Sequence, residues 1–220
     1  MKRIVLMLLL ASLAVGCSHS LLNQVRGSGN RQHQERQVAS FTSIDTNGAF
    51  DITVVSQKQH ALEIEGDDNV LPMIATDVSG NVLHIRNRSS YSVSQPIKIT
   101  ISVPNLEAVT LNGAGRLRIT DLKNDRFELD VNGAPALEAS GETKFLKIKA
   151  NGAGNIDTHR LRATRADVNS NGIAQIDLYA REQLDVVVSG PSNVNYQGDP
   201  VVNKTINGPG TIQKKASQGS

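Results

Sequence analysis

The stretch Leu111-Asn112-Gly113-Ala114-Gly115 (LNGAG) recurs in variant form along the second half of the chain. Its variants are VNGAP at 131–135, ANGAG at 150–154, SNGIA at 170–174 and INGPG at 206–210. Asn-Gly is a strong turn signal, because both residues tolerate a positive φ. A turn that returns at regular intervals predicts a repeated structural unit.

The repeat has a period close to twenty residues. Its motif glycines are spaced by 20, 19, 20, 18 and 18 residues: Gly113, Gly133, Gly152, Gly172, Gly190 and Gly208. An aliphatic residue stands four places after every one of them: Leu117, Leu137, Ile156, Ile176, Val194 and Ile212. Most intervening positions are polar, and alternation of this kind predicts strands with one buried face. Each repeat therefore contains one strand before the turn and one after it.

Matching positions one full repeat apart favour parallel strands. In an up-and-down antiparallel barrel the partners are successive strands, and columns have no reason to match at twenty residues. The sequence therefore predicts an all-β fold, a right-handed parallel β-helix with coils of about 18–20 residues. Its domain is expected over residues 41–214, with regular coils over 108–212 and a disordered tail over 215–220. Upstream of residue 108 the turns are irregular, which predicts less ideal coils or a capping section.

The asparagines that precede the motif glycines can have two roles. Stacked Asn side chains can form a hydrogen-bonded ladder, as in cross-β assemblies. Alternatively, Asn is present only for its tolerance of left-handed backbone. In both interpretations the turn pairs are structural: Asn112 with Gly113, Asn132 with Gly133, Asn151 with Gly152, Asn171 with Gly172, and Asn207 with Gly208.

The N-terminus has the features of a secretory signal peptide over residues 1–16. Lys2 and Arg3 precede an apolar run, 4–15, that is too short to span a bilayer. The sequence Ala14-Val15-Gly16-Cys17 is similar to a bacterial lipobox, with Ala14 where Leu is usual. Cys17 is the only cysteine, and lipidation would account for an unpaired thiol in an exported protein. A free thiol or an intermolecular disulfide is the alternative.

These features predict a lipoprotein anchored to the outer membrane through acyl chains, palmitate among them, on Cys17. Ser18 follows the cysteine where Asp would favour the inner membrane. Residues 17–40 are rich in Gln, Asn and Arg, and we expect the lipidated cysteine followed by a polar tether, part of which can join the first coil. The sequence does not indicate whether the protein faces the periplasm or the exterior.

The charge balance excludes one class of partner. The chain has 23 Lys and Arg and 21 Asp and Glu, and cleavage before Cys17 removes Lys2 and Arg3. The mature chain is then neutral, so it has no net positive field to attract nucleic acid. No nucleic-acid partner is expected.

Several segments together resemble a bacterial family, the putative auto-transporter adhesin, head GIN domain family. They are RGSGN (26–30), FTSIDTNGAFDITVV (41–55), EGDDNVLPMIATDVSGNVLHI (65–85) and the serial NGAG turns. The likeness covers residues 25–215 and implies an exported or lipid-anchored β-helical protein with an adhesin-like role. It supplies no catalytic residues. If the Gly-Ser-Gly-Asn segment of this family forms a first coil, the tether shortens to about 18–25.

Candidate chemistry is confined to one acidic column. Glu138, Asp157 and Asp177 stand five places after their motif glycines and are predicted to stack on an outer face ~4.8 Å apart. Such carboxylates could hold a hard cation, as in calcium-binding β-helix lyases, or form a solvated stripe. The five histidines lack metal-ligand spacing, and no cofactor is expected.

Non-catalytic binding is the leading functional prediction. Coils of 18–20 residues leave little room for the long loops that form deep catalytic clefts on β-helices. We therefore expect a binding, adhesin-like or structural protein whose ligand is a glycan or a surface protein, and self-association through coil ends is a further option. A calcium-dependent carbohydrate-active β-helix, similar to a polysaccharide lyase, is the alternative.

Overall fold

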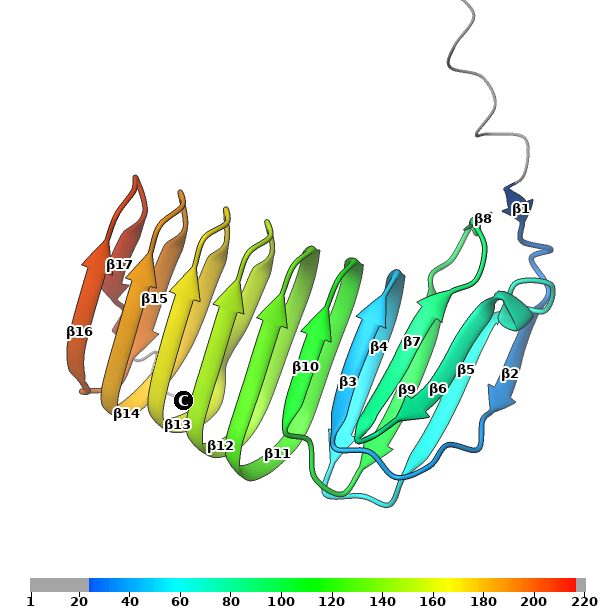
Figure 1. Ribbon diagram of the computed structural model, residues 1–220, viewed down its shortest axis with the longest axis horizontal. Coiled ribbons are helices and arrows are strands. Elements are labelled where there is room, and N and C mark those ends of the chain that lie inside the picture. The colour runs from blue at the N-terminus through cyan, green and yellow to red at the C-terminus, as the bar shows by residue number, and fades with distance from the viewer. Residues whose placement is uncertain (1–23, 217–220) are drawn as a thin grey trace, which may run out of the picture.

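The computed structural model describes residues 24–216 and shows a β-solenoid, in which coils stack along one long axis (Figure 1). The predicted lipid site, Cys17, and the predicted signal peptide therefore lie outside the described residues. Most of the stack consists of four long bent strands, each of which runs around one coil: β11 (Ala114–Val131), β12 (Ala134–Ala150), β13 (Asn155–Ser170) and β14 (Gln175–Val188). The last coils contain three shorter strands: β15 (Asn193–Gln197), β16 (Val201–Ile206) and β17 (Thr211–Lys214).

Parallel pairing at the predicted register holds these coils together. Leu129 pairs with Ile148, which pairs with Val168, which pairs with Val186. Residues one repeat apart thus stand directly over each other, and the predicted parallel solenoid is confirmed. Parallel pairing continues from β14 to β15 and β16, and from β15 to β17.

The predicted aliphatic columns form the core. Four places after the motif glycines, Leu117, Leu137, Ile156, Ile176 and Val194 are all buried. The columns lose their burial in the last coil, where Ile206 is 44% exposed and Lys204 continues the column of Val186. Burial ends there because no further described coil covers that face.

The motif glycines are required by contact between coils. A Cβ atom built on Gly133 would lie 1.7 Å from the carbonyl oxygen of Gly113, and one on Gly152 would lie 1.8 Å from that of Gly133. No motif pair from Asn112–Gly113 to Asn207–Gly208 has a positive φ. Positive φ occurs instead just after the first of these turns, at Gly115 (φ 106°), and at the next corner, at Asp121 (φ 58°) and Gly141 (φ 130°). The left-handed role, one of the two left open for the asparagines, is therefore not adopted at these pairs, and close backbone approach explains the glycines.

The asparagines form the hydrogen-bonded ladder. Each side-chain amide donates to the Oδ1 atom of the preceding coil's asparagine: Asn132 to Asn112 (3.1 Å), Asn151 to Asn132 (2.9 Å) and Asn171 to Asn151 (3.2 Å). At its lower end Asn112 donates to Asp45 at 2.8 Å. Ser189 occupies the next position, and its shorter side chain ends the ladder before Asn207. Of the two roles left open by the sequence, the ladder is the one adopted.

The first part of the chain forms coils whose order in space differs from their order in sequence. Strand β3 (Ser43–Asn47) lies between β10 (Ala108–Leu111) and β7 (Val82–Asn87), and β4 (Ala49–Ser56) lies between β11 and β9 (Ile97–Val103). The coil that comes first in the chain is thus enclosed by two that come later (Figure 1).

Antiparallel strands close this end of the stack. Strand β5 (Ala61–Asp67) pairs with β9, and β6 (Ile74–Ser79) pairs with β7, joined to β5 through the short 3₁₀ helix η1 (Leu71–Met73). Strand β2 (Arg31–Glu35) adds to the edge of β5. The expected capping section is therefore present. Its hairpins supply the covered edge that a parallel stack lacks.

The folded region begins before residue 41. Strand β1 (Val25–Arg26) pairs with β8 (Tyr91–Ser92), and the Gly-Ser-Gly-Asn loop that follows is bound to the capping section. Gly29 N donates to Asp67 at 3.0 Å, and Asn30 donates to Asp68 at 2.8 Å. The part of 17–40 from residue 24 onward is therefore not a free tether. The polar sequence of β2 concealed it, because an edge strand needs only backbone pairing.

Candidate ligand-binding groove

The acidic column is assembled as the spacing predicts. Glu138 pairs in register with Asp157, and Asp157 with Asp177, while Arg118 precedes them and Asn195 follows. All three carboxylates project from the face formed by the first half of each coil. Their side chains are 21–37% exposed.

Each of these carboxylates has partners from the chain itself. Glu138 accepts from Arg118 at 3.1 Å and from Arg160 at 3.2 Å. Asp157 is bonded to His159, and Asp177 to Lys215 and Asn195. In residues 24–216 no group of three or more His, Cys, Asp or Glu side chains could hold a metal ion. Glu138 and Asp177 are thus ion-paired within the chain, and Asp157 is bonded to a neighbouring histidine.

Asp177 has a pKa below its ordinary value. Burial raises the pKa of its carboxyl group, but hydrogen bonds from Lys215 and Asn195 outweigh that effect and hold the pKa below its ordinary value of 3.8. The carboxylate is therefore ionised at neutral pH. Its negative charge joins the end of the chain to the stack.

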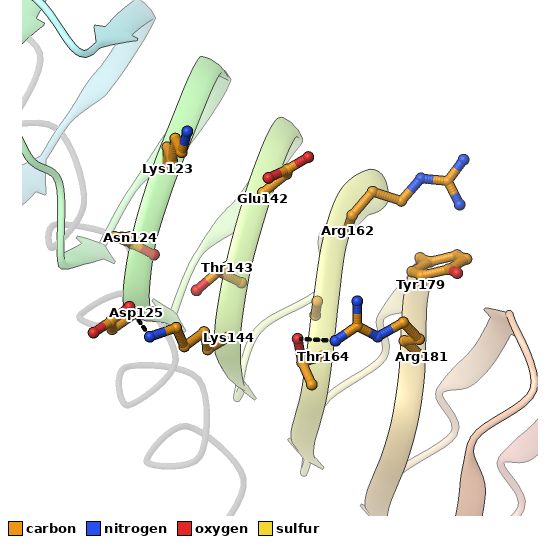
Figure 2. A pocket seen from close by; sticks show the side chains of 11 residues that line it. Lys123, Asn124, Asp125, Glu142, Thr143, Lys144, Arg162, Thr164, Tyr179 and Arg181 are labelled. Atoms are coloured by element: carbon orange, nitrogen blue, oxygen red, sulfur yellow. Dashed lines mark hydrogen bonds and ion pairs between the residues drawn. The ribbon is translucent and has the colours of Figure 1, made fainter.

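A groove of about 570 Å³ lies on another face of the stack, along the middle of the long strands β11 to β14. Its first wall is a column in register across four coils: Lys123, Glu142, Arg162 and Tyr179. Its floor consists of Asn124, Thr143 and Ala163, which are also in register. The second wall contains Asp125, Lys144, Thr164 and Arg181 (Figure 2).

The side chains of the second wall support one another. Lys144 Nζ lies 2.8 Å from Asp125 Oδ1, and the Arg181 guanidinium donates to the Thr164 hydroxyl at 3.2 Å (Figure 2). Arg181 also pairs with Glu182 at 3.0 Å. These contacts are exposed and contribute little stability, but they restrict where the cations lie.

On the first wall, a cation–π contact positions an arginine. The Arg162 guanidinium carbon lies 4.3 Å from the centre of the Tyr179 ring. Within residues 24–216, no carboxylate lies within ion-pair distance of Arg162 or of Lys123. Stacking on a ring leaves the N–H edges of a guanidinium able to donate to a ligand.

A change of register shapes the groove. Thr158 pairs with Leu178, but Arg162 already pairs with Tyr179, so residues 159–161 of β13 have no counterpart in β14. The β14 coil takes a shorter path around this corner. The first wall therefore has no constant offset from the turns: Lys123 lies 10 residues after Gly113, whereas Tyr179 lies only 7 after Gly172. Alignment on the motif glycines consequently missed this site.

The fold defines the class of the protein as a parallel β-solenoid with an open polar groove. Comparison with protein families gives a more specific result: the family described as "Putative auto-transporter adhesin, head GIN domain" matches residues 40–200. The chain belongs to this family. Comparison with curated proteins finds no match.

Solved structures support the fold. A "putative adhesin" from Bacteroides fragilis has 23% sequence identity and a TM-score of 0.70, over 87% of this chain and 100% of that one. A "putative lipid binding protein" from Parabacteroides distasonis has 22% identity and a TM-score of 0.59, over 88% and 100% of the two chains. A "putative adhesin" from Parabacteroides merdae has 17% identity and a TM-score of 0.52, over 88% and 99%. These likenesses establish a shared architecture.

The described part of the chain contains no helix with the length and apolar character needed to cross a membrane.

Proposed function

We propose that the chain is a lipid-anchored protein of the bacterial cell envelope whose solenoid binds a ligand without transforming it. Membership of an adhesin-like family fits an extracellular or envelope protein with a binding role. The observation that carries the binding role is the groove, a polar and open surface on a rigid stack of paired strands. Rigid walls reduce the entropy lost on binding.

The anchor is the second part of the proposal. The signal-like segment, residues 1–16, ends before Cys17, and the first described strand begins only eight residues after that cysteine, at Val25. Two or more acyl chains hold a protein firmly on a membrane, whereas one does so only marginally. Ser18 supports placement at the outer membrane. The solenoid would then lie close to the membrane surface.

Fractionation of cells tests the anchor. The natural chain should sediment with the outer membrane, and Ser18→Asp should shift it toward the inner membrane. A variant with a cleavable non-lipoprotein signal in place of residues 1–17 should become soluble, as should any processed Cys17→Ala chain. Mass measurement distinguishes processed from unprocessed protein. Sedimentation of the processed, unlipidated chains with membranes would refute the anchor.

Retention on immobilised protein tests the binding role. Mature protein should retain at least one member of a broad panel of glycans, matrix proteins and bacterial or host cells. A denatured sample is the control for adhesion to unfolded chain. The absence of retention across the panel would contradict a binding function.

A further inference from the structure

We propose that the groove between Lys123 and Arg181 binds an acidic polysaccharide through the carboxylates of its sugar units, an inference that rests on the proposed binding function. The groove contains four cations, Lys123, Lys144, Arg162 and Arg181, and only two carboxylates, Asp125 and Glu142. A neutral mature chain therefore has a local positive surface at this groove. Charge complementarity selects an anionic ligand.

The carboxylate-binding position lies at the end of the groove formed by β13 and β14. Arg162 on the first wall is stacked on Tyr179, and Arg181 on the second wall is held by Thr164. Of the two carboxylates that line the groove, Asp125 and Glu142, neither lies on β13 or β14, although Arg181 also pairs with Glu182 beside the groove (Figure 2). A guanidinium binds a carboxylate through two parallel N–H···O bonds, so two held guanidiniums can bind one or two such groups.

The remainder of the groove suits hydroxyl groups. Glu142 and Asp125 can accept hydrogen bonds from sugar hydroxyls, and the Thr143, Thr164 and Tyr179 hydroxyls can donate or accept. A continuous polyphosphate would meet repulsion from Asp125 and Glu142. A polymer that alternates anionic and hydroxyl groups meets a partner at each position, which favours a carboxylated polysaccharide over a nucleic acid.

The dimensions also fit a polymer. Adjacent coils are ~4.8 Å apart, so the four coils that line the groove span about 14 Å. This length and a volume of about 570 Å³ accommodate a short run of sugar rings. The walls run along the stack and are open to solvent, so a chain longer than the groove can pass through it.

Binding of mature, full-length protein to defined polymers tests the proposal. The probes are carboxylated polysaccharides (polygalacturonate, alginate, hyaluronan and polysialate), neutral dextran, polyglutamate and a single-stranded oligonucleotide. We expect binding to at least one carboxylated polysaccharide. Binding to dextran, to polyglutamate and to the oligonucleotide should be at least tenfold weaker. Added salt should weaken the binding, because exposed charges are screened.

Variants then locate the site. Arg162→Ala and Arg181→Ala should each reduce the affinity by about tenfold or more, which corresponds to about 1.4 kcal/mol for each tenfold step. Lys149→Ala is the matched control, because it removes an exposed cation near the end of β12, outside the groove. This variant should bind with unchanged affinity. Unchanged thermal unfolding shows that the variants remain folded, and Arg162→Gln serves if Arg162→Ala does not fold.

The outcomes separate the inference from the proposed function. Equal binding to polyglutamate or to the oligonucleotide, or binding that Arg162→Ala and Arg181→Ala leave intact, would overturn the groove as a site for acidic sugars. Retention of only neutral glycans or proteins would overturn it too, while the binding function would stand. No retention of any ligand, in this test and in the broad panel, would overturn both.

Discussion

Gly133 lies directly over Gly113, so closely that a Cβ atom on Gly133 would be 1.7 Å from the Gly113 carbonyl oxygen. The same approach recurs at Gly152 and Gly172, and it leaves no space for any side chain at these corners. The coils are therefore spaced by backbone contact on this edge. Each corner depends on the one beneath it.

Replacement of Gly133 by Ala should destabilise the fold. The added methyl group meets backbone, which cannot move aside as a flexible side chain can, so we expect a loss of about 2–4 kcal/mol in the free energy of unfolding. Denaturant unfolding measures it. Ala134→Ser is the control, because residue 134 is exposed and should change stability by less than about 0.5 kcal/mol. Equal effects of the two substitutions would contradict the close-approach explanation.

Asn151 is a ladder position with a hydrogen bond to the coil on each side. Its amide donates to Asn132 and its carbonyl oxygen accepts from Asn171, so Asn151→Ala removes two hydrogen bonds. At about 0.5–1.5 kcal/mol for each bond, the free energy of unfolding should fall by about 1–3 kcal/mol. Asn207→Ala, whose side chain forms no ladder bond within residues 24–216, should have a smaller effect in the same thermal or denaturant assay. A larger effect at Asn207 would show that the ladder does not stabilise the stack.

Asp177 should make stability depend on pH in the acid range. Hydrogen bonds from Lys215 and Asn195 hold the folded pKa below the ordinary value of 3.8, so the unfolded chain takes up a proton first as the pH falls. The stabilisation is present in full well above pH 3.8 and is lost as the pH drops through the folded value. Asp177→Asn should make the melting temperature less dependent on pH in this window than in the natural chain. An unchanged pH profile would show that Asp177 makes no such contribution.

Calcium should leave the melting temperature unchanged. A bound ion stabilises the folded state by about 2.7 kcal/mol at one hundred times its dissociation constant, so millimolar calcium would reveal a functional site. Glu138 and Asp177 already form ion pairs within the chain, and Asp157 is bonded to His159, so a calcium ion would have to compete with these partners. Calorimetry of the natural chain, compared with an alanine triple variant at these positions, provides the test. A rise with calcium that the triple variant lacks would restore the lyase-like alternative.

The last coil should resist self-association because lysines occupy its core columns. Lys204 continues the column of Val186, and Lys214 that of Leu178 and Tyr196. Strands β16 and β17 each have one strand partner among the described residues, and charges on such edges oppose pairing with another chain. The double variant Lys204→Ile/Lys214→Ile should therefore associate at concentrations where the natural chain does not.

Sedimentation velocity measures that association. Lys149→Ile, which adds an apolar residue on a lateral face, is the matched control for added hydrophobicity. Association of the natural chain through β16 and β17 would contradict the role of the lysines and favour self-association through coil ends.

The pattern of alternating apolar and polar residues repeats about every twenty residues, and this repetition made the parallel stack predictable. Leu117, Leu137 and Ile156 align in sequence because each coil repeats the local pattern of the one below, and stacking then turns alignment into contact. The acidic column was predictable from the same repeat, because its residues lie on strands that begin directly after the turns. The ion pairs of Asp177 did not, because Lys215 is 38 residues away in the chain.

By itself, the sequence determined the coil length, the aliphatic core of the regular coils and the positions of the corners, because these depend on interactions that repeat along the chain. Only the tertiary structure decided the rest. Strand β3 entered the stack between β10 and β7 because long-range pairing, not chain order, sets the neighbours of a coil. The groove depends on which residues of neighbouring coils pair at the corner, as at Arg162 and Tyr179, and only the packed coils decide that pairing.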